Sequence, residues 1–161
     1  MNLKALRYIT IHYPGGTIDV DGKDNVYQDA DFAQILRNMQ NDYVRNRGYS
    51  LGYNSAIAPD GDEWEIRGSR YRCAANGCTK VNTPGYAIIV VTPSINASPS
   101  SAQVRGVNQA IARVRAMAKA AGNTNTLVVN GHRDVKPLCG KGGTACPGTP
   151  LYNLIKNGAI K

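Results

Sequence analysis

Long apolar runs are absent from this 161-residue sequence. No stretch approaches the ~18 consecutive apolar residues of a membrane-spanning helix, and the opening residues MNLKALR lead into a polar segment, not the apolar core of a secretory signal. Repeats and low-complexity tracts are missing too. We therefore expect a single domain over residues 1–161, made in the cytoplasm, without a transmembrane segment or a separate binding domain.

Acidic residues are scarce as well. The 11 Asp and Glu residues are outnumbered by 19 Lys and Arg residues, which gives a net charge of +8. Such an excess attracts polyanions, and nucleic acid, anionic membranes and anionic cell-wall polymers all qualify. The basic residues are spread along the chain instead of forming one arm, and no nucleic-acid-binding motif accompanies them. We therefore expect no nucleic-acid partner.

The remaining composition, 42% hydrophobic and 19% charged, is typical of a folded domain. Patterning predicts alternating strands and helices, hence an α/β fold with a central mixed β-sheet flanked by helices. The predicted strands are 8–13, a hairpin of 53–57 and 63–67, the apolar run 86–92, and 127–130. The predicted helices are 31–47, a long helix that begins after the capping box Ser100–Gln103 and ends at Gly122, and a short closing helix around 151–155.

Only two histidines occur, and both lie at the ends of predicted strands: His12 and His132. Strand ends at the edge of an open α/β sheet are common places for functional sites. Cys146 follows in the loop after His132. Two imidazoles and one thiolate can hold zinc tetrahedrally with the fourth position open to water, which is the pattern of a catalytic site.

Several ordered motifs carry a resemblance. These are IHY after the first strand, GYN before a hairpin with PDG in its turn, WEIRG, VNTPGYAIIVV, GHRDVKP and ACPGTPLYNLI. In this order they resemble the type 2 N-acetylmuramoyl-L-alanine amidase family, which includes bacteriophage endolysins and peptidoglycan recognition proteins. The similarity runs from about Tyr8 to Ile155. It implies an amidase-like fold and an activity on peptidoglycan.

The resemblance also implies roles for single residues. His12, His132 and Cys146 would bind Zn²⁺, Tyr53 would face the attacking water, and Thr144 would donate to the developing oxyanion. Positions that would contact the substrate are Asn54, Arg67 and Asn82. Arg133 and Asp134, beside His132, are interpreted as residues that hold their loop.

Some positions depart from the family pattern. Asn54 stands where the family usually has histidine, and the stretch 73–77 lacks a histidine that is common there. Ile88, Ile89 and Val90 replace the catalytic glutamate of some branches, which points to the endolysin and recognition-protein branch. The interval from His132 to Cys146 is longer than usual. Cys139 therefore competes as third ligand, although the Pro147-Gly148 that follows Cys146 favours the latter.

The other cysteines leave alternatives open. Cys73 and Cys78 lie five residues apart, which allows reduced thiols, a small disulfide loop, a bridge to Cys139, or a second zinc site that includes Cys139. A cytoplasmic product favours reduced thiols until its release.

The leading hypothesis is a monomeric zinc-dependent hydrolase that cuts the amide between N-acetylmuramic acid and the L-alanine of the stem peptide. It would act as a phage endolysin, made in the host cytoplasm and released to the cell wall, where anionic polymers would attract its basic surface. The alternatives are a peptidoglycan-binding module without turnover, a metal-free peptidase that pairs Cys146 with His132, and a basic nucleic-acid binder.

Overall fold

A five-stranded mixed sheet forms the centre of the molecule in a computed structural model that describes residues 1–15 and 32–161. The strand order is β3-β2-β4-β1-β5. The strands are β1 (Tyr8–His12), β2 (Ser55–Ile57), β3 (Glu63–Glu65), β4 (Gly85–Val90) and β5 (Val128–Gly131). β1 pairs in parallel with both β4 and β5, β2 pairs in parallel with β4, and β2 and β3 form the antiparallel hairpin. The prediction of a mixed α/β sheet is confirmed.

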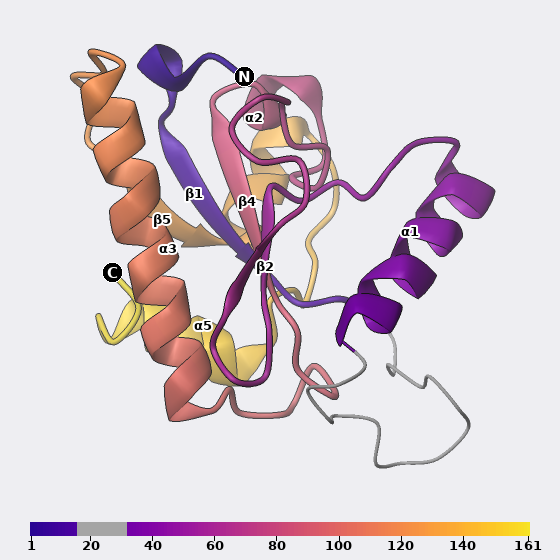
Figure 1. Cartoon of the computed structure of the whole chain (residues 1–161). Coiled ribbons are helices and arrows are strands. Elements are labelled where there is room, and N and C mark those ends of the chain that lie inside the picture. The colour runs from indigo at the N-terminus through magenta and orange to yellow at the C-terminus, as the bar shows by residue number, and fades with distance from the viewer. Residues whose placement is uncertain (16–31) are drawn as a thin grey trace.

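Helices cover both faces of this sheet (Figure 1). The long helices are α1 (Phe32–Arg47) and α3 (Ser101–Ala120), which lie on opposite sides of the sheet, and α5 (Thr149–Lys156) closes the chain. Shorter turns are the 3₁₀ turns η1 (Leu3–Ala5) and η3 (Lys136–Cys139) and the helices α2 (Thr79–Asn82) and α4 (His132–Val135). The predicted start of α1 at Asp31 lies outside the described residues.

Strand β4 is buried on both faces, as its continuous apolar run predicts. Side chains with even numbers, such as Tyr86 and Ile88, join the core against α3, whereas Ala87 and Ile89 join the core against α1. All four are completely buried. This alternation makes β4 the partition between the two hydrophobic cores.

The N-terminus of α3 forms the predicted capping box. The Ser100 hydroxyl accepts from the Gln103 amide at 3.0 Å, and the Gln103 side chain accepts from the Ser100 amide at 3.1 Å. Two otherwise unpaired helix N–H groups are thereby satisfied.

The hairpin strands are shorter than predicted. The Asn54 carbonyl accepts from the amides of both Ile66 and Gly68, so the regular ladder ends at Glu65. The short turns η1, α2, α4 and η3 were not predicted, because periodicity is not readable over three or four residues.

Among the described residues, none of the helices combines the length and the apolar character that a membrane crossing requires.

Helix α3 approaches the hairpin turn very closely at Gly106. A Cβ at this position would overlap the backbone of Gly61. We expect Gly106→Ala to lower the free energy of unfolding by about 1–3 kcal/mol, because overpacking outweighs the better helix propensity of alanine. Urea denaturation measures this, with Gly142→Ala as the control, since a Cβ there meets no described atom. A Gly106→Ala protein as stable as wild type would contradict the close packing.

Candidate metal centre and its groove

The two histidines meet at one edge of the sheet because their strands are parallel neighbours. Ile11 of β1 lies beside Gly131 of β5. The residues that follow them, His12 and His132, therefore lie at the same edge of the sheet. Their ring centroids are 4.6 Å apart. Cys146 reaches this point from the loop before α5, and ligand atoms of the three residues all lie within 4.8 Å of one another. The structure thus brings the three predicted ligands together.

The donor atoms fit a zinc ion. With usual zinc–nitrogen and zinc–sulfur bonds and tetrahedral angles, bound nitrogen and sulfur atoms lie about 3.6 Å apart. Nδ1 of His12 is 3.7 Å from Sγ of Cys146. Nε2 of His132 is buried and has no hydrogen-bond partner among the described residues. Buried polar atoms are rarely left unpaired, so this grouping of donors has the character of a cation site.

Burial sets the protonation of these groups. It lowers the pKa of His12 to about 3, with a further contribution from neighbouring His132. It also lowers the pKa of His132 to about 4, where Lys136 adds to the effect. Both imidazoles are therefore neutral at pH 7, with lone pairs available to a cation. Burial raises the pKa of the Cys146 thiol to about 11, so a bound cation is what would hold it as a thiolate.

Backbone contacts hold Cys146 in place. The Tyr13 amide points to its Sγ at 3.5 Å, and its carbonyl accepts from the Arg133 amide at 2.9 Å. Asp134 accepts from the Gly131 amide at 2.9 Å and from the Tyr152 hydroxyl at 2.7 Å. Arg133 and Asp134 thus fix the loop around the cluster, in keeping with their structural interpretation.

A cavity of about 570 Å³ opens onto the cluster. His12, His132 and Cys146 line it together with Tyr53 and Thr144. Its other polar side chains belong to Tyr13, Tyr43, Arg47, Tyr49, Lys136 and Lys141. Three of these carry positive charge, and none of the described lining residues is acidic, so the groove favours anionic ligands.

Two hydroxyls in this lining match the predicted catalytic positions. Tyr53 is 5% exposed, its ring centroid is 5.3 Å from that of His12, and its hydroxyl accepts from Tyr43 at 3.1 Å. Burial raises the pKa of Tyr53 well above its usual value, so the phenol keeps its proton. The Thr144 hydroxyl accepts from the Cys146 amide at 3.2 Å, which leaves its own hydrogen free to donate.

The three predicted substrate-contacting residues lie elsewhere. Asn54 is completely buried, and its amide bonds the Gly68 and Tyr71 carbonyls and the Ala87 amide. These bonds join the start of the hairpin to the segment after β3 and to β4, and Asn54 does not line the groove. Its substrate role stays a prediction.

Arg67 and Asn82 are also structural. The Arg67 guanidinium donates to the carbonyls of Leu51, Arg72 and Ser50. Asn82 is 8% exposed and accepts from the Asn76 amide at 2.8 Å. Neither residue lines the groove, and their assignment as substrate contacts stays a prediction.

The cysteine alternatives are reduced to one arrangement. Cys78 and Cys139 form a disulfide with a Cα–Cα distance of 5.7 Å, and Cys73 and Cys146 are free. Cys139 is therefore unavailable as a metal ligand, which leaves Cys146 as the third member of the cluster. Cys78 and Cys139 are therefore not the reduced thiols that a cytoplasmic product favours.

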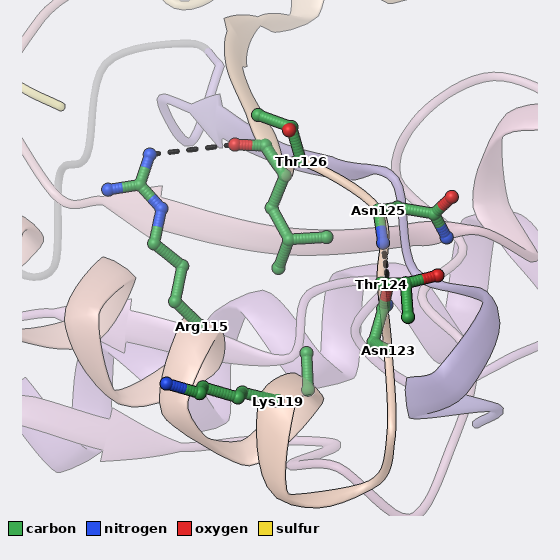
Figure 2. A pocket seen from close by; sticks show the side chains of 8 residues that line it. Arg115, Lys119, Asn123, Thr124, Asn125 and Thr126 are labelled. Atoms are coloured by element: carbon green, nitrogen blue, oxygen red, sulfur yellow. Dashed lines mark hydrogen bonds between the residues drawn. The ribbon is translucent and has the colours of Figure 1, made fainter.

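A second cavity of about 420 Å³ lies at the far end of α3, remote from the cluster (Figure 2). Arg115 and Lys119 border it on the helix side, and Asn123 to Thr126 on the other. The amide groups of Asn123 and Asn125 bond carbonyls of η1 and Leu6. This cavity brings together no metal-ligating or nucleophilic groups.

Solved structures of peptidoglycan recognition proteins (PGRPs) share this fold. PGRP-SA of Apis mellifera superposes with a TM-score of 0.74 at 19% identity, covering 95% of this chain and 82% of that protein. Drosophila PGRP-LB gives 0.73 at 22% identity, with 94% and 79% covered. Human PGRP-Iβ C, solved with glycosamyl muramyl pentapeptide, gives 0.74 at 21% identity, with 94% and 82% covered.

None of the curated proteins compared with this chain matches it in sequence. The family model described as N-acetylmuramoyl-L-alanine amidase matches residues 2–149, which include the whole sheet and all members of the His–His–Cys cluster. The chain therefore belongs to the N-acetylmuramoyl-L-alanine amidase family of the Amidase_2 type.

Proposed function

We propose that this protein is a zinc-dependent peptidoglycan hydrolase that cleaves the amide between N-acetylmuramic acid and the L-alanine of the stem peptide. The observation that carries the proposal is the convergence of His12, His132 and Cys146 in a groove that Tyr53 and Thr144 also line. Family membership supplies the reaction class.

Zinc held by the two imidazoles and the thiolate would supply a Lewis acid for the scissile carbonyl and lower the pKa of the attacking water toward ~7. The chain's own groups do the rest. Tyr53 and Thr144 border the same cavity as the cluster, and both are neutral donors. Hydrogen bonds from such hydroxyls to the developing oxyanion stabilise a tetrahedral transition state more than the ground state.

Tyr43 supports this arrangement from the neighbouring helix. Its hydroxyl donates to that of Tyr53, so the Tyr53 proton is left to point elsewhere. Arg47, above the Tyr43 ring at 4.7 Å, and Lys136 place positive charge along the groove. These cations would attract the carboxylates of a stem peptide.

The peptidase alternative is less compatible with the site. A nucleophilic thiolate needs a lowered pKa, whereas burial raises the pKa of Cys146 to about 11. The Cys146 sulfur also contacts His12 at 3.7 Å, not the His132 partner that this alternative requires.

A binding module without turnover is the second candidate, because the structural neighbours are named for recognition. The complete donor set and the two hydroxyls favour catalysis. We further propose the setting of a phage endolysin, made in the host cytoplasm and released to the wall. Buried Ile88 and Ile89, where other branches carry a glutamate, are consistent with the branch that holds both endolysins and recognition proteins.

Zinc content tests the metal site. We expect wild type to carry about one zinc per chain at saturating metal, and His12→Ala or Cys146→Ala to carry essentially none, since three protein ligands are needed. Plasma emission spectrometry of dialysed protein measures this. The double variant Cys78→Ala/Cys139→Ala is the matched control, because it removes two sulfurs outside the cluster and should keep the full stoichiometry. If Cys146→Ala kept its zinc and the double variant lost it, Cys139 would be the third ligand in place of Cys146.

The bond that is cut distinguishes an amidase from other wall hydrolases. Digestion of purified peptidoglycan is expected to release new L-alanine amino termini without new reducing sugar ends, because the muramyl amide is the scissile bond. Mass spectrometry of the products, with end-group labelling, measures both. New reducing ends would identify a glycosidase, and binding without any product would identify a recognition module.

Tyr53→Phe removes the proposed oxyanion donor and little else. We expect kcat to fall by about 10²-fold, as for loss of one such donor, while the zinc stoichiometry stays unchanged. Tyr71→Phe is the control, since Tyr71 is 64% exposed and does not line the groove. Equal activity of the two variants on a soluble muramyl peptide would exclude Tyr53 from catalysis.

A further inference from the structure

Asn76 is a completely buried polar residue that supports one metal ligand from behind. It lies in the segment between β3 and α2, and its Oδ1 is 2.9 Å from Nε2 of His12. It does not line the groove, so it has no access to a substrate there. Its contact with His12 spans 64 positions of the sequence.

The orientation of the Asn76 amide is fixed by its other partners. Its Nδ2 donates to Sγ of Cys73 at 3.4 Å, and its backbone amide donates to the Asn82 side chain at 2.8 Å. Burial raises the pKa of Cys73 to about 12, so this sulfur stays a neutral thiol, which lies 3.4 Å from the Asn82 Oδ1. With Nδ2 used toward Cys73, Oδ1 is the atom that faces His12.

This orientation dictates the tautomer of His12. A carbonyl oxygen only accepts hydrogen bonds, so Nε2 must carry the proton and Nδ1 must keep its lone pair. Nδ1 is the atom that lies 3.7 Å from Sγ of Cys146. The hydrogen bond therefore turns the coordinating nitrogen toward the cluster and fixes the plane of the ring.

A disulfide anchors the segment that carries Asn76. Cys78 is joined to Cys139 at the end of η3, and a Cβ on Gly77 would lie 3.4 Å from the Cys139 sulfur. η3 follows directly on α4, which begins at His132. The residue behind His12 is thus tied covalently to the segment that carries the other histidine.

We propose that Asn76 is a positioning residue that holds His12 in the Nε2-protonated tautomer and thereby strengthens cation binding by the His12–His132–Cys146 cluster. This rests on the proposed function only in assuming that the cluster binds zinc. Partners that orient a ligand histidine typically contribute 10–100-fold to metal affinity.

The first test is the tautomer itself, read in metal-free protein by long-range ¹H–¹⁵N NMR of the histidine side chains at pH 7. Wild type is expected to show His12 protonated at Nε2. Asn76→Leu is expected to show a mixture of tautomers or protonation at Nδ1, and Asn76→Asp, which keeps the acceptor, is expected to restore the wild-type pattern. Protonation of wild-type His12 at Nδ1 would overturn the proposal.

The second test is zinc affinity, measured by competition with a chromophoric chelator. Asn76→Leu is expected to bind zinc about 10–100-fold more weakly than wild type, and Asn76→Asp within a few-fold of it. Asn123→Leu is the control, because it makes the same substitution at a hydrogen-bonded asparagine at the far end of α3, where the side-chain amide donates to the Leu3 and Leu6 carbonyls. Affinity of Asn76→Leu equal to wild type would overturn the proposal.

These outcomes separate the inference from the proposed function. If zinc affinity depends on Asn76 as expected but no L-alanine termini are released, the positioning role is supported and the amidase activity is contradicted. If the protein cleaves the amide and Asn76→Leu binds zinc as tightly as wild type, the amidase activity is supported and the positioning role is contradicted. If Asn76→Leu fails to fold, the wild-type tautomer and the Asn76→Asp affinity still decide.

Discussion

Parallel pairing of β1 with β5 is the constraint on which the site depends. Because the two strands run in the same direction and in register, their last residues emerge at the same edge, and His12 and His132 leave the sheet side by side. An antiparallel neighbour would place its end at the opposite edge. β4 pairs with the other side of β1 and is buried on both faces, so it holds β1 rigidly between the two cores.

The same burial that stabilises the strands shapes the chemistry of the cluster. Withdrawal from water disfavours charged imidazoles, which keeps both histidines neutral over the physiological range. It also disfavours an isolated thiolate at Cys146. A cation reverses this second effect, because it compensates the negative charge that burial alone would suppress. Desolvation therefore leaves both imidazoles in the neutral state that metal binding by this cluster would require.

The sequence could predict much of the fold and the central part of the site. The apolar run of β4 and the capping box of α3 are local signals, and both are found as predicted. The cluster was predictable because ordered motifs identify the family, and family position is enough to say which residues end which strands. Motif position does not say which way a side chain points. The sequence therefore could not show that the side chains of Asn54, Arg67 and Asn82 bond backbone groups of neighbouring segments.

The features that the sequence left undecided or unseen share one physical cause: they join segments far apart in the chain through side chains. The Asn76–His12 contact and the Cys78–Cys139 disulfide are separated by 64 and 61 positions, and neither follows from periodicity or spacing. The two histidines are also held in place in different ways. His132 begins α4 and is placed by local geometry, since Asp134 of the same turn accepts from the amide of Gly131, just before His132, and from the Tyr152 hydroxyl. His12 ends a strand, where no such local turn exists, and its ring is oriented by a side chain delivered from another segment. A ligand at a strand end can thus be positioned by the strand, while its tautomer has to be set by a neighbour.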